Sequence, residues 1–214
     1  MENKTRRLQY NAPVTLTYTF MCLGVLLLGT ATHHISTKFL FSNYKTSFLD
    51  PFQYIRLFTH ILGHINWEHF SGNFLIILLL GPMLEEKYGS KSMVEMIMIT
   101  AFVTGILNTI LFDSALLGAS GIVFMMILLS SFANAETGKI PLTLVIVVII
   151  FLGKEVVSGI FIEDNVSQIT HIIGGLCGGA FGYRKIHSWN TFYESNRMRK
   201  AVEKDIKIDY VNYI

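Results

Sequence analysis

The chain alternates long apolar runs with short polar connections. Crossing about 30 Å of hydrocarbon takes roughly 20 helical residues, and a helix satisfies its own backbone groups there. Six runs approach this length, and we expect a membrane-spanning helix over each: 14–31, 63–84, 93–112, 115–133, 140–162 and 165–183. The fifth run is the weakest, because Gly153, Lys154 and Glu155 interrupt it, and the sequence leaves its outer end open.

This pattern predicts an all-α fold, a polytopic membrane protein built as a bundle of six transmembrane helices over residues 14–183. Residues 1–13 form a short N-terminal segment, and residues 184–214 form a mixed-charge C-terminal tail. The first two spans are joined by a long external loop, 32–62, whose many aromatic residues suit the headgroup region of a bilayer.

Composition supports a membrane protein and excludes several other classes. Of the 214 residues, 51% are apolar and only 15% are charged, against about one quarter charged in an ordinary soluble domain. Mean hydropathy is +0.48. The net charge of +2 is too small to suggest nucleic-acid binding. Cys22 and Cys177 both lie in apolar runs, so no disulfide framework is expected.

The distribution of positive charge predicts the orientation. With a cytoplasmic N-terminus, 13 of the 17 Lys and Arg residues fall in cytoplasmic segments, as the positive-inside rule requires. Both termini are then cytoplasmic, and the second, fourth and sixth spans enter from the external face. The compact six-span form points to a bacterial inner membrane, with an organelle membrane as the alternative.

Four polar residues interrupt the apolar runs. His69 and Asn73 lie four residues apart in the second run, Ser120 lies in the fourth and His171 in the sixth. Each is costly in hydrocarbon, although any one alone is explained by helix packing or an interhelical hydrogen bond. Counted from the external start of each span, Ser120 is the sixth residue and both histidines are the seventh, roughly 9–10 Å below the surface. Packing alone does not require such a common level.

These side chains suit acyl transfer. An imidazole can take the proton of a serine hydroxyl and return it to a leaving amine, so Ser120 and His171 are the candidate nucleophile and base. His69, Asn73 and the Ser120 backbone N–H can donate to a developing oxyanion. No aspartate lies within a predicted span, so we expect a Ser-His dyad without an acidic third member. Gly174 and Gly178 would let the sixth span approach the fourth closely.

A metal site is the rival within enzymes. His60, His64 and His69 lie near Glu68, and His60 and His64 have the i, i+4 spacing that can hold zinc. Neither His-Glu-x-x-His nor His-x-x-Glu-His occurs, since three residues separate His64 from Glu68. We therefore expect no metal and no cofactor.

Taken together, these motifs resemble those of the rhomboid intramembrane serine proteases of the basic six-helix type, over about residues 52–183. Gly118-Ala119-Ser120-Gly121 is similar to the family's Gly-x-Ser-Gly. His171, Gly174 and Gly178 match its sixth-span motif, and His64, His69 and Asn73 have the spacing of its second-span motif. The turn with Glu85, Glu86 and Gly89 is also similar. Two positions depart from the pattern: Ile55 replaces the Trp of a Trp-Arg pair, and Thr170 replaces a small residue before His171.

The resemblance implies a Ser120 nucleophile, a His171 base, and an oxyanion hole of His69, Asn73 and the Ser120 amide, with Gly118, Gly121 and His64 in support. Substrates would be other membrane proteins, cut near the outer face, and residues 163–168 with the fifth span would act as cap and gate. The alternatives are a catalytically silent relative that binds or escorts membrane helices and, less well supported, a small transporter. The sequence identifies neither the substrate nor the oligomeric state.

Overall fold

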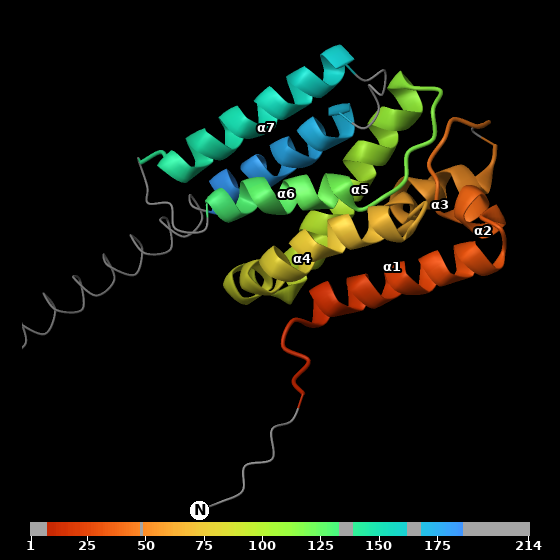
Figure 1. Ribbon diagram of the computed structural model, residues 1–214, viewed down its shortest axis with the longest axis horizontal. Helices are drawn as coiled ribbons and strands as arrows, with labels where there is room; N and C mark the ends of the chain where they lie inside the picture. Colours follow the sequence, from red (N-terminus) through yellow and green to blue (C-terminus); the bar gives the residue numbers. More distant parts are fainter. Residues whose placement is uncertain (1–7, 48, 133–138, 162–167, 186–214) are drawn as a thin grey trace, which may run out of the picture.

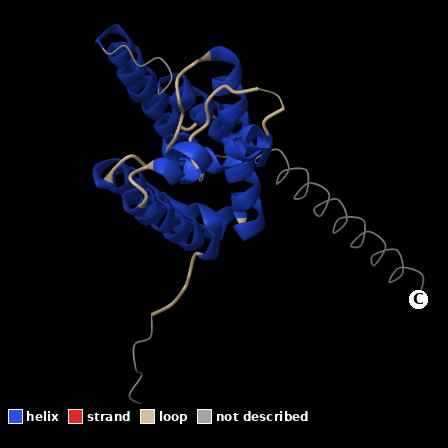
Figure 2. Ribbon diagram, turned by 90° about the vertical axis from the view of Figure 1, so that its right-hand side faces the viewer, coloured by secondary structure: helices blue, strands red, loops and turns tan. Residues whose placement is uncertain are grey.

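The computed structural model describes residues 8–47, 49–132, 139–161 and 168–185, and all regular elements in these ranges are helical (Figure 2). In chain order they are α1 (Pro13–Ala31), α2 (Ile35–Leu40), α3 (Pro51–Thr59), the 3-10 turn η1 (His60–Leu62), α4 (Trp67–Tyr88), α5 (Ser90–Leu111), α6 (Ser120–Ser131), α7 (Leu142–Phe161) and a last helix over 168–185. The all-α expectation agrees with this architecture. Within the described ranges, α1 and α5 are long and apolar enough to cross a bilayer on their own.

Proline, aspartate and glycine residues set where several helices begin and end. Pro13 occupies the first turn of α1, and Pro51 does the same in α3, where the Asp50 carboxylate accepts a hydrogen bond from the Phe52 N–H. Both placements follow from the free N–H groups of a first turn. Gly89 has φ of 83° and separates α4 from α5, a backbone conformation that glycine adopts without strain.

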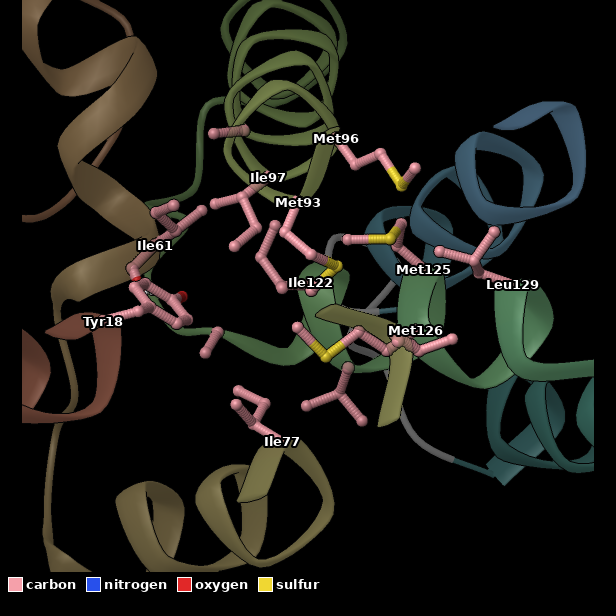
Figure 3. Close-up of a cluster of buried hydrophobic side chains, with 14 of the residues drawn as sticks. Tyr18, Ile61, Ile77, Met93, Met96, Ile97, Ile122, Met125, Met126 and Leu129 are labelled. Atoms are coloured by element: carbon pink, nitrogen blue, oxygen red, sulfur yellow. Dashed lines mark hydrogen bonds between the residues drawn. The ribbon is translucent and has the colours of Figure 1, made fainter. Parts of the chain in front are cut away.

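The helix α6 lies at the centre of the bundle, with α4 on one side and the 168–185 helix on the other (Figure 1). Most of its residues are buried, including Ile122, Met125, Met126 and Leu129. They pack against Met93, Met96 and Ile97 of α5 and Ile77 of α4 (Figure 3). Methionine suits such a core because its unbranched side chain fills irregular gaps between helices.

The loop between α1 and α4 is held by one arginine. Arg56 is only 1% exposed. It donates to the Asp50 carboxylate at 2.6 Å, the Thr46 hydroxyl at 3.1 Å and the Phe39 carbonyl at 3.3 Å, and its guanidinium lies 4.4 Å from the Tyr44 ring centroid. Ile55 is exposed. The departure at position 55 therefore leaves the anchoring of this loop intact, because Arg56 makes the contacts.

A second polar junction joins the first three long helices at the end where α1 begins. The Glu85 carboxylate of α4 accepts hydrogen bonds from the N–H groups of Val14 and Thr15, from the Thr15 hydroxyl and from the Ser90 hydroxyl of α5, all at 2.7–3.0 Å. It thereby caps the N-terminus of α1, which has no capping side chain of its own. Gly81, one turn earlier on α4, lies against the Thr15 side chain.

Candidate active site

The first part of the site is the start of α4. Asn66 precedes this helix, and its side-chain oxygen accepts a hydrogen bond of 2.8 Å from the His69 N–H. This N-cap fixes His69 as the third residue of the helix, so His69 and Asn73 are one turn apart on the same face. His69 is half-buried and Asn73 is buried.

His64 holds Asn73 in place from the turn before α4. It is fully buried, with Nδ1 3.2 Å from the Leu62 carbonyl oxygen and Nε2 3.2 Å from Asn73 Nδ2. The carbonyl can only accept, so Nδ1 carries the proton and Nε2 accepts from the Asn73 amide. The His64 ring also meets the His69 ring edge-on at 5.0 Å. His64 thus orients both residues expected in the oxyanion hole.

Gly118 brings the serine loop against His69. Its φ is 122°, and a Cβ at this position would come within 2.7 Å of His69 Cε1 and Nε2 and 4.0 Å of Asn73 Nδ2. Its N–H donates to the His60 carbonyl at 2.9 Å. Only glycine satisfies both the backbone conformation and the contact, so this residue sets how closely the loop and α4 approach.

Ser120 is the first residue of α6, and it is half-buried. The expectation that the helix begins near residue 115 is wrong, so Ser120 is not its sixth residue, and His69 is the third residue of α4 and not the seventh. Ser120 and His69 nevertheless both lie in the first turn of their helices. The Ser120 N–H is among the first four of α6, which have no acceptor within the helix and point out of its N-terminal end.

The last helix packs directly on α6 through two glycines. A Cβ on Gly174 would overlap the Gly121 carbonyl oxygen, and one on Gly178 would overlap the Met125 carbonyl oxygen. The two backbones are therefore in contact along two turns. Side chains larger than hydrogen at these positions would push the helices apart.

This packing places His171 beside the first turns of α6. Its ring centroid is 4.2 Å from that of Phe124, which lies one turn after Ser120 on the same face. The preceding residue, Thr170, is buried, with its methyl 3.4 Å from where a Gly121 Cβ would stand. The structure thus places His171 beside Phe124, one turn after Ser120, and His69 and Asn73 beside Gly118, two residues before Ser120. Thr170 fits without disturbing this arrangement.

Sequence reasoning missed the residues that hold the segment before Ser120. Asn43 and Leu116 exchange backbone hydrogen bonds of 2.7 and 2.8 Å. The Asn108 amide of α5 donates to the Asn43 carbonyl and side-chain oxygens and to the Ser114 carbonyl, at 3.1–3.2 Å. Asn43 and Asn108 are both buried. Asn108 could have been found from the sequence, because it is a carboxamide inside an apolar run. Placing it in hydrocarbon has the same energetic cost as placing Asn73 there.

The histidines once considered as metal ligands are engaged elsewhere. His60 Nε2 lies 3.0 Å from the Ala101 carbonyl oxygen, and both His64 nitrogens have partners in the protein. Within the described ranges no group of three His, Cys, Asp or Glu side chains could hold a metal ion.

Comparison with known proteins agrees with this architecture. Residues 51–188 match the model of the Rhomboid domain. The chain belongs to the rhomboid family. Members of this family are integral membrane proteins, and the family includes intramembrane proteases. One similar protein is the rhomboid protease GluP of Bacillus subtilis (strain 168), 28% identical over 184 residues. The match covers 80% of this chain and 34% of the relative, so the chain spans about a third of that protein's length.

Proposed function

We propose that this chain is an intramembrane serine endopeptidase that cleaves transmembrane or juxtamembrane segments of other membrane proteins with a Ser120–His171 dyad. The observation that supports the proposal is that residues on both sides of Ser120 in the chain contact other proposed site residues: Gly118 lies against His69 and Asn73, and Phe124, one turn into α6, lies against His171. Rhomboid membership and the likeness to a rhomboid protease support the same reaction.

The proposed chemistry proceeds in two halves. His171 accepts the proton of the Ser120 hydroxyl while Oγ bonds to the scissile carbonyl carbon, and the resulting oxyanion accepts hydrogen bonds from the Ser120 N–H, His69 and Asn73. The C–N bond then breaks as His171 gives its proton to the leaving amine. Water repeats the sequence on the acyl-enzyme, with His171 as base, and releases the second product.

We propose six spans formed by α1, α4, α5, α6, α7 and the 168–185 helix, with both termini cytoplasmic, in a bacterial inner membrane. The helix α6 has 12 residues, about 18 Å of rise against about 30 Å of hydrocarbon. If its far end reaches the inner surface, Ser120 lies about 12 Å below the outer one. The assigned gate includes α7, and most of the assigned cap (163–168) lies outside the described residues.

The runner-up is a catalytically silent relative that binds membrane helices. A binder needs neither a serine at a helix N-terminus nor an imidazole beside it, and both are present here. The two hypotheses differ in one measurable property, turnover.

The decisive experiment compares purified wild type with Ser120→Ala, His171→Ala and the matched control Ser130→Ala, which changes a serine at the far end of the same helix. Each is incubated in detergent with a single-span substrate and with a fluorophosphonate probe. We expect cleavage and labelling by wild type and Ser130→Ala only. The dyad would be refuted if wild type neither cleaved the substrate nor reacted with the probe, or if either site variant kept full activity. Loss of activity with a chelator would support a metal site.

A further inference from the structure

An apolar groove outside the candidate active site runs along one side of the bundle. It is enclosed by α1, α3, η1 and α5 and has a cavity volume of about 480 Å³, within the roughly 300–1,000 Å³ of ligand-sized cavities. Its walls are almost entirely hydrocarbon and include Val14, Met21, Phe58, Leu62, Ile97 and Met98. Met21 and Met98 are half exposed at its rim, so the groove is open from the side.

The hydroxyl groups that line this groove are already bonded within the protein. Tyr18 donates to the Ile61 carbonyl at 2.8 Å, Thr59 donates to the Leu40 carbonyl, and Thr17 pairs with the Tyr10 hydroxyl at 3.0 Å. A peptide or a polar metabolite would therefore leave its own donors and acceptors unpaired, at high cost in an apolar site. The chemistry of the walls selects a hydrocarbon chain.

The position of the groove along the helices selects the leaflet. Its residues on α1 run from Pro13 to Met21, and on α5 from Val94 to Met98, both near the N-terminal ends of their helices. Eight residues of helix rise about 12 Å, close to the depth of one leaflet's hydrocarbon. The groove is also lined by Ile61 and Leu62 of η1. With the proposed orientation, the end of the groove at Pro13 and Val94 faces the cytoplasmic headgroups.

A cation lies near the cytoplasmic end of the groove. Lys91 is exposed in the first turn of α5, and with Val94 and Met98 it follows the i, i+3, i+7 spacing of one helix face. Neither Lys91 nor the nearby carboxylate Glu95 lines the groove itself, so Lys91 would meet the headgroup and not the acyl chain. A lysine at headgroup level above an apolar groove favours a lipid whose headgroup is negatively charged.

We propose that this groove binds one acyl chain of an anionic phospholipid from the cytoplasmic leaflet, with the phosphate near Lys91. The occupant would pack against Ile61 and Leu62 of η1. The adjacent His60 carbonyl accepts the Gly118 N–H of the serine loop, so the lipid would support the turn that holds the candidate active site. The leaflet, but not the acyl site itself, rests on the proposed orientation.

The test uses the full chain purified in detergent and analysed by native mass spectrometry with added phosphatidylglycerol or phosphatidylcholine. Met98→Trp fills the groove from its rim, and Ile99→Trp, equally exposed on α5 but outside the groove, is the matched control. Lys91→Gln removes the cation, and Lys45→Gln removes an exposed lysine at the other end of the bundle.

We expect one retained lipid per wild-type chain, at least tenfold weaker retention in Met98→Trp, and no change in Ile99→Trp. Lys91→Gln should lose the preference for phosphatidylglycerol over phosphatidylcholine while keeping the acyl chain; Lys45→Gln should keep both. No retained lipid in wild type, or equal retention by the two tryptophan variants, would overturn the acyl site. An unchanged preference in Lys91→Gln would overturn the headgroup assignment. Repeating the series in Ser120→Ala separates lipid binding from turnover.

Discussion

At the scale of single residues, Gly118 constrains the candidate site most tightly. Its φ of 122° disfavours every L side chain, and the space a Cβ would need is filled by the His69 ring. The same residue donates its N–H to His60. A change here would shift the loop relative to α4 while leaving the buried core of α6 untouched.

We expect Gly118→Ala to reduce substrate cleavage by at least a hundredfold, because displacing His69 or the Ser120 amide removes an oxyanion donor worth roughly 2.7–4 kcal/mol. Cleavage rate and fluorophosphonate labelling measure the loss. Gly24→Ala, on a helix position with open space, is the control and should keep wild-type activity. Wild-type turnover by Gly118→Ala would contradict the assigned oxyanion hole.

At the scale of elements, the contact between α6 and the 168–185 helix depends on backbone approach. Gly178 lies against the Met125 carbonyl, whereas its neighbour Gly179 has open space where a Cβ would stand. The two glycines are adjacent in sequence, but one is tightly packed and the other is not. They therefore make a matched pair for substitution.

Gly178→Val should lower the melting temperature and reduce activity at least tenfold, because the added methyls overpack a backbone contact at a cost of about 1–3 kcal/mol. Gly179→Val should stay within about 0.5 kcal/mol of wild type. Thermal unfolding followed by circular dichroism, with parallel cleavage assays, compares them. Equal melting temperatures for the two variants would mean that the helices are not packed as described.

The loop between α1 and α4 offers a pH-dependent test. The Arg56 guanidinium, which donates to Asp50, holds the pKa of that carboxyl below its usual range. As pH falls, Asp50 is therefore protonated at a higher pH in the unfolded state than in the folded state. The stabilisation from the Asp50–Arg56 pair is complete above about pH 3.9 and is lost as pH falls through the lower folded pKa. Hydrogen exchange of 32–62 should increase below that pH.

Asp50→Asn should show faster exchange in this loop already at neutral pH and a flatter acid response. Asp113→Asn, whose carboxylate is 92% exposed and pairs only distantly with Lys45, should behave like wild type. An acid response of the loop that is identical in all three proteins would assign it to other groups.

The sequence predicted helix boundaries best where a helix is apolar throughout. It predicted them least well where a polar contact to a distant residue determines where a helix begins. The apolar run expected from residue 14 starts within one residue of α1, and the residues of the candidate site were proposed from their cost in hydrocarbon. The start of α6 was misplaced because Ala115, Leu116 and Leu117 favour a helix. What prevents one is the pairing of Leu116 with Asn43, over seventy residues away, and the positive φ of Gly118.

At the scale of the whole molecule, the Glu85 junction couples α1, α4 and α5 through one carboxylate. It lies at the opposite end of α4 from His69 and Asn73, so it is remote from the proposed chemistry. The adjacent Glu86 is exposed and serves as a comparison of equal charge.

Glu85→Ala should lower the free energy of unfolding by about 1–3 kcal/mol, because its buried donors lose their acceptor. Glu86→Ala should cost less than about 0.5 kcal/mol. Thermal melts in detergent measure both, and the cleavage rate well below the melting temperature should change little in either. A Glu85→Ala protein as stable as Glu86→Ala would mean that the junction does not hold the helices together.

The stretch between α5 and α6 also bears on how the chain assembles. Residues 112–119 are not helical, and several of their backbone groups reach partners only through Asn43, His60 and Asn108. In a bilayer such a stretch cannot settle before those partners are in position. All three are synthesised earlier, so we expect the nascent chain to dock α1, α4 and α5 before α6 reaches its final depth. The proposed active site would then form only late in biogenesis.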